Sequence, residues 1–119
     1  GGPAGRESAL RRGAVAATLK LLPLPAAPGT PQRGGAASGE EGQAAALRLL
    51  LNFAAHKRAQ VALVELGLDR VLWANWSPTS SQEVRSLSSM VLHNVRGNPA
   101  NTTALYIAEL RAKRACAML

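Results

Sequence analysis

The chain has 119 residues, of which 47% are hydrophobic and only 3% aromatic, and its formal net charge is +7. This length suits one domain, and a core that is rich in small alanine side chains favours thin packing of helix against helix. The single cysteine excludes an intrachain disulfide, and no apolar run reaches the roughly 18 residues that a membrane-spanning helix needs.

The chain opens with a predicted pair of helices. Residues 7–22 are expected to form a short helix, a break at Gly13 and a second helix. The residues expected to face inward are Leu10, Val15, Leu19 and Leu22. Pro23 ends this pair, because proline disfavours the helical conformation of the residue before it. Residues 23–39 are dense in proline and glycine and have too few apolar anchors to offset their ordering entropy, so we predict a flexible insert.

A third helix is predicted after the insert. Ser38 and Glu41 form a capping box that opens this helix, which should run to about His56. Its core stripe is expected to consist of Leu47, Leu50, Leu51 and Ala54.

The next stretch repeats the short and long helical pair. Residues 59–66 and residues 68–76 are predicted to form a short helix and a longer one, divided by Gly67. A glycine permits the sharp backbone turn between two such helices. Trp73 and Trp76 lie in the longer helix, where packing in the core is favoured over a stacking platform for bases.

The clearest helical pattern spans residues 83–96. Its apolar positions step by three, four and four residues along one buried stripe, formed by Val84, Leu87, Val91 and Val95. Ser80 and Glu83 form a predicted capping box at its start, and Gly97 follows its end.

The final predicted helix covers residues 100–119. Asn98 is expected to cap it, with Pro99 at its first position. Its inward residues would be Leu105, Ala108 and Leu110, and its outward residues Arg111, Lys113 and Arg114.

Two of these helices carry an asparagine near the end, and Asn52 and Asn94 are 42 residues apart. A helical unit that recurs at such an interval predicts stacked repeats, in which each unit buries its face against its neighbours. The order of elements in residues 61–72 and 83–95 resembles the three helices of an armadillo repeat. Residues 88–92 are further similar to a segment of the ataxin-ten family.

The resemblance implies an all-α armadillo-like helical repeat (α-solenoid) fragment of about two repeats plus part of a third. Residues 1–22 would form the first two helices of repeat one, and residues 40–55 its third helix, on either side of the flexible insert at residues 23–39. Repeat two would occupy residues 56–97, and residues 98–119 would begin repeat three. Since no polar cap closes the array, we expect the remainder of a longer parent chain.

The resemblance also implies a partner-binding concave face. In armadillo proteins, asparagines at the positions of Asn52 and Asn94 hold the backbone of a bound partner. Arg48 and Met90 lie one turn before them, where peptide-binding armadillo proteins place tryptophan. We therefore expect a protein partner that is a helix or a mixed apolar and acidic segment. The alternative is a local role, in which the two amides bond to carbonyls at the helix ends.

The pattern contains no predicted catalytic residue, metal ligand or cofactor site. His56 and His93 are isolated, with no second ligand at metal-binding spacing. Cys116 has Arg114 nearby but lies in an apolar helix, which favours a buried structural thiol. We thus expect a non-catalytic protein–protein interaction scaffold.

A basic α-helical nucleic-acid-binding module is the alternative function. Residues 1–39 carry a net charge of +4 and residues 40–119 a net charge of +3, with no clustering of the basic residues in the second part. Dispersed charge makes nucleic acid the less favoured partner.

We expect a cytoplasmic or nuclear chain without a membrane partner. Residues 9–27 partly resemble a targeting segment, because Arg11 and Arg12 are followed by Ala, Val and Leu with few acidic residues. Mitochondrial import is therefore the minority alternative.

Overall fold

The computed structural model describes residues 3–24 and 39–117, and it is all-α, with no strand in these ranges. Most of the predicted flexible insert, at residues 25–38, lies outside the described residues. The helices are α1 (Pro3–Leu19), α2 (Glu40–Phe53), α3 (Lys57–Trp76), α4 (Gln82–Arg96), the 3₁₀ turn η1 (Pro99–Asn101) and α5 (Thr102–Ala117). None of the helices described is long and apolar enough to cross a membrane.

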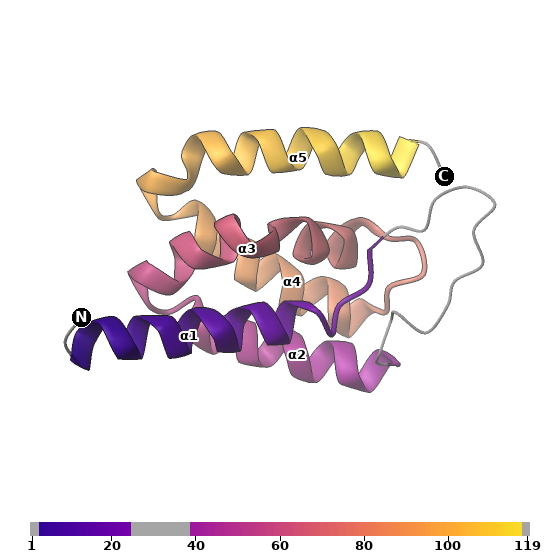
Figure 1. The fold of residues 1–119 in the computed structure, drawn as a ribbon. Helices are drawn as coiled ribbons and strands as arrows, with labels where there is room; N and C mark the ends of the chain where they lie inside the picture. Colours follow the sequence, from indigo (N-terminus) through magenta and orange to yellow (C-terminus); the bar gives the residue numbers. More distant parts are fainter. Residues whose placement is uncertain (1–2, 25–38, 118–119) are drawn as a thin grey trace.

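The helices form two layers (Figure 1). In one layer α3 lies between α1 and α5 and packs against both of them. In the other layer α2 and α4 pack side by side, and α4 also packs along α3. The two layers are therefore held together mainly by the contact of α3 with α4.

Leucine, valine and alanine fill the space between the layers. The largest side chains that are fully buried are Val15, Leu19, Leu22, Leu47, Leu50, Leu63, Leu68, Val71, Leu72, Val84, Val91 and Val95. The predicted stripe of α4 is confirmed, because its three valines are completely buried and Leu87 packs partly buried against them. Burying each such side chain contributes about 1.5–3 kcal/mol relative to leaving it exposed. Trp73 is buried as well, as its predicted place in the core requires.

The two glycines that were predicted to divide helices behave differently. Gly67 has a φ of 147° and breaks the helical path inside α3, as predicted. Gly13 lies within the continuous helix α1, so the predicted break there is wrong. The physical reason is that one glycine costs a helix interior only about 1 kcal/mol, and the buried Val15 and Leu19 extend the packed face beyond it.

The helix ends differ from the predicted capping boxes. The N-cap of α4 is Ser81, whose Oγ accepts the backbone N–H of Val84 at 3.1 Å, so the assignment to Ser80 is wrong by one residue. The N-cap of α2 is Gly39, which has no side-chain cap, and Ser38 lies outside the described residues. Asn98 is a cap as predicted, with its Oδ1 accepting the N–H of Ala100 at 3.0 Å, but it caps the 3₁₀ turn η1, and α5 begins only at Thr102.

Two helix assignments near the chain's middle and end also change. α2 ends at Phe53, and His56 is the N-cap of α3. In α5 the predicted inward residues Leu105 and Ala108 are buried, but Leu110 is 50% exposed and Ala112 is buried instead. The buried stripe of α5 thus consists of Leu105, Ala108 and Ala112 at helical spacing, and the larger Leu110 lies outside it. The side chain of Cys116 is outside the part that the structure describes.

Candidate functional site

An open groove of about 700 Å³ lies along α2 and α4. Its lining consists of Leu51 from α2 and of Ser89, Met90, His93, Asn94 and Arg96 from α4. Two of the four predicted contact residues, Met90 and Asn94, therefore line the same groove. The other two, Arg48 and Asn52, are exposed on α2 and are not part of this lining. We call this feature the α2–α4 groove.

Helical spacing explains why Met90 and Asn94 lie on the side of α4 that is nearest to α2. The guanidinium of Arg48, on α2, donates to the carboxylate of Glu83, at the start of α4. Met90 and Asn94 are seven and eleven residues after Glu83, so all three project from one side of the helix. The Arg48–Glu83 pair thus lies at one end of this side of α4, and Asn94 lies toward its other end.

The centre of the groove is apolar. Met90 is 52% exposed, although it belongs to a helix whose opposite side is fully buried. Leu51 is partly buried and packs against the core below it. Methionine has a flexible, polarizable side chain that adapts to different apolar partners, which is why it is frequent at binding surfaces. This pair can therefore bury an apolar side chain of a ligand.

The two predicted asparagines keep their amides available. Within residues 3–24 and 39–117, no hydrogen bond to the side-chain amide of Asn52 or Asn94 is present. Their proposed local role at the helix ends gains no support from these residues, because the turn after α2 is closed by backbone bonds from Ala54 and Ala55. Both amides can donate and accept hydrogen bonds with a ligand's backbone.

The polar rim of the α2–α4 groove is basic. The guanidinium of Arg96 pairs with Glu109 of α5, and the imidazole of His93 is exposed. No carboxylate belongs to the lining that the structure describes. The Arg48–Glu83 pair is exposed on both sides, and in the Arg96–Glu109 pair the guanidinium is exposed while the carboxylate is partly buried. Surface ion pairs contribute only about 0–1 kcal/mol each, so a ligand carboxylate can compete for either guanidinium.

Asn75 of α3 forms hydrogen bonds with the part of α4 that lines the groove. The sequence pattern did not predict this role. Its Nδ2 donates to the Oγ of Ser89 at 2.8 Å, to the Oγ of Ser88 at 3.1 Å and to the carbonyl of Arg85 at 3.1 Å. These bonds fix α3 against α4, the helix that carries most of the lining of the groove, including Ser89. The position of Asn75 just before the end of a predicted helix was the only available signal.

A second polar junction joins the other ends of α3 and α4. The Nδ2 of the buried Asn101 donates to the carbonyls of Val95 at 3.1 Å and Gln60 at 3.3 Å. The Nδ2 of Asn98 donates to the Oε1 of Gln60 at 3.1 Å. These bonds hold the turn after α4 against the start of α3, which fixes the end of the helix that carries Asn94.

The two histidines lie at different places among the residues that the structure describes. His56 is exposed at the start of α3, while His93 lies in the groove. In the part of the chain that the structure describes, no three His, Cys, Asp or Glu residues come close enough to share a metal ion. Comparisons of the chain with protein-family models, curated proteins and solved structures give no match.

Proposed function

We propose that this chain is a non-catalytic protein-interaction scaffold that binds a helix or an extended segment of a partner protein in the α2–α4 groove. The observation that carries the proposal is the exposed Met90 in an open groove beside the unbonded amide of Asn94. An apolar anchor flanked by hydrogen-bonding groups is a common arrangement at peptide-binding surfaces.

The proposal includes an armadillo-like arrangement of the helices. It is supported by the kink at Gly67, which divides α3 into two segments of similar length ahead of α4. It is further supported by the packing of α2 beside α4, the two helices that carry Asn52 and Asn94. The continuous α1 departs from the pattern, because an armadillo repeat would have two helices there. A cytoplasmic or nuclear location stays a prediction.

The groove favours a partner of mixed apolar and acidic character. Its apolar centre accepts a leucine-like side chain, and the guanidinium of Arg96 at its rim, which pairs with Glu109, can exchange that partner for a carboxylate of the ligand. The absence of a carboxylate among the lining residues described makes a basic peptide a poor fit, since nothing there would pair with it. This occupant agrees with the expectation drawn from Arg48 and Met90 in place of tryptophan.

The first experiment maps binding onto the chain by NMR. The probe is a designed amphipathic helix of about four turns with leucine on one face and glutamate beside it, and the matched control peptide replaces each glutamate with lysine. We expect the acidic peptide to shift the backbone amides of residues 89–96 and the control to shift them far less. Equal shifts from both peptides, or shifts confined to α5, would contradict the proposal.

Nucleic acid is tested on the same sample. A duplex oligonucleotide is titrated at low and at moderate salt, because phosphate contacts weaken steeply as salt rises. Tight, salt-sensitive binding of the oligonucleotide that exceeds binding of the acidic peptide would favour the basic nucleic-acid module instead.

A further inference from the structure

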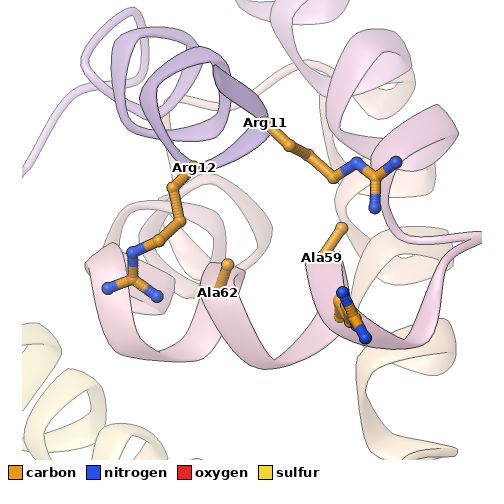
Figure 2. A pocket seen from close by; sticks show the side chains of 5 residues that line it. Arg11, Arg12, Ala59 and Ala62 are labelled. Atoms are coloured by element: carbon orange, nitrogen blue, oxygen red, sulfur yellow. The ribbon is translucent and has the colours of Figure 1, made fainter. Parts of the chain in front are cut away.

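A smaller pocket, of about 130 Å³, lies between α1 and α3. It is lined by Arg11 and Arg12 of α1 and by Arg58, Ala59 and Ala62 of α3. Figure 2 shows the side chains of Arg11 and Arg12 leaving α1 in different directions, Arg11 to the side of Ala59 and Arg12 past Ala62 on the opposite side. Because the two alanines present only methyl groups, space remains open between the arginine side chains. We call this feature the arginine pocket.

The described carboxylates do not balance the positive charge of the arginine pocket. Arg12 pairs with Glu65 at 2.7 Å. Among the side chains that the structure describes, no carboxylate is within ion-pairing distance of Arg11 or Arg58. The first turn of α3 has no acidic residue either. Among the described side chains, the three guanidinium groups of the pocket and the carboxylate of Glu65 sum to a charge of +2.

The arginines elsewhere in the described residues are mostly engaged. Those with a carboxylate or backbone carbonyl partner outside the pocket are Arg48, Arg70, Arg85, Arg96 and Arg111. Arg11, Arg58 and Arg114 have no such partner in the same part of the chain. Two of these three unpaired guanidinium groups line one pocket, so their free donors are concentrated at a single place.

We infer that the arginine pocket binds the phosphate group of a phosphorylated side chain on a partner protein. A phosphate monoester carries about −1.5 to −2 charges at pH 7, which matches the unbalanced charge of the pocket. Its oxygens accept paired hydrogen bonds from the planar guanidinium fork of arginine. The pocket has room for one tetrahedral group of this size. A carboxylate would bring only one negative charge.

The surroundings favour a single phosphate over a nucleic-acid backbone. A nucleic acid needs basic groups that follow a track of successive phosphates. Here most other described arginines are engaged by carboxylates or carbonyls, so they do not form such a track. The inference does not depend on the α2–α4 groove, because the arginine pocket belongs to the layer of α1 and α3.

The two unpaired arginines should cost the free protein some stability. Arg11 and Arg58 bring like charges to one small pocket, and like charges at short range repel each other. The variant R58Q removes one of them from an exposed position, so it is expected to melt no earlier than the wild type. A loss of phosphate binding in R58Q would then reflect the missing guanidinium, not a loss of folding.

The test is an NMR titration with a short glycine-flanked phosphoserine peptide, its unphosphorylated form, and inorganic phosphate, at constant ionic strength. We expect the phosphopeptide to shift the amides of Ala59 and Ala62, and the unphosphorylated peptide to leave them in place. R58Q and the double variant R11Q/R58Q should weaken the binding at least tenfold. R11K/R58K should recover only part of it, because lysine keeps the charge but lacks the fork.

The matched control is R114Q, which removes another unpaired arginine from outside the arginine pocket. It changes the net charge as much as R58Q does, and it should leave the phosphopeptide affinity within about twofold. Equal weakening by R114Q and R58Q would overturn the inference, because it would show a general charge effect. Binding of inorganic phosphate without binding of the phosphopeptide would also overturn it, since a partner's side chain could then not enter. Tighter binding of a single-stranded oligonucleotide, sensitive to R114Q, would assign the arginines to nucleic acid.

Discussion

The side-chain amide of Asn75 donates hydrogen bonds to the hydroxyl groups of Ser88 and Ser89, at 3.1 and 2.8 Å. Asn75 lies near the end of α3, and the two serines lie in the middle of α4. Ser88 is completely buried, and Ser89 lines the α2–α4 groove. One amide therefore links the core contact between the layers to the surface proposed to bind a partner.

Replacing Asn75 with alanine should lower the free energy of unfolding by about 1–3 kcal/mol, because the buried Ser88 and the carbonyl of Arg85 lose a donor. Urea denaturation followed by circular dichroism measures the change. The control is N52A, in which an exposed amide without a bond to the described residues is removed from a helix. N52A should change stability by less than about 0.5 kcal/mol. Similar losses in both variants would contradict the assigned role of Asn75.

The two glycines give a second contrast. Gly67 has a φ of 147°, which a residue with a Cβ rarely adopts, so G67A should destabilise the protein by about 1–3 kcal/mol. At Gly13 a Cβ would meet no heavy atom within 4 Å, and the backbone is helical, so G13A should stabilise by about 0.5–1 kcal/mol. Thermal melting of both variants checks this. A lower melting temperature for G13A would mean that α1 needs its glycine.

Neighbouring leucines in α2 provide the third prediction. Leu50 is completely buried and Leu49 is 45% exposed. L50A should lower the free energy of unfolding by about 2–5 kcal/mol, since it removes core contacts and leaves a cavity. L49A makes the same chemical change on the exposed face and should cost less than about 1 kcal/mol. Chemical denaturation distinguishes the two, and an equal cost would show that α2 is rotated about its axis.

The helices follow from the sequence because their apolar positions repeat with helical spacing. The stripe of Val84, Val91 and Val95 is an example, since burial of one side of α4 requires only local pattern. Leu110 shows the limit of this reasoning. Hydropathy alone places the leucine inward, whereas the direction in which α5 meets α3 buries Ala112. The start of α4 differs from the prediction by one residue, because the neighbouring Ser80 and Ser81 can both serve as caps.

The candidate sites depend on which helices become neighbours, and local pattern does not contain that information. Met90 and Asn94 could be chosen from their spacing on one helix, but Leu51 joins them only through the packing of α2 beside α4. The arginine pocket is a stronger case. Arg12 and Glu65 are 53 residues apart, and only the contact of α1 with α3 brings them together. No motif in the sequence links these positions.

The direct test of the proposed scaffold is calorimetric titration of the acidic amphipathic helix into the wild type and into the double variant M90A/N94A. The control is S86A, which alters an exposed residue of α4 that does not line the groove. We predict that M90A/N94A weakens binding by about 1–3 kcal/mol, roughly 5–150-fold in Kd, while its melting temperature stays close to that of the wild type. S86A should bind as the wild type does. Unchanged affinity in M90A/N94A together with a clear drop in its melting temperature would contradict the proposal and make both side chains structural.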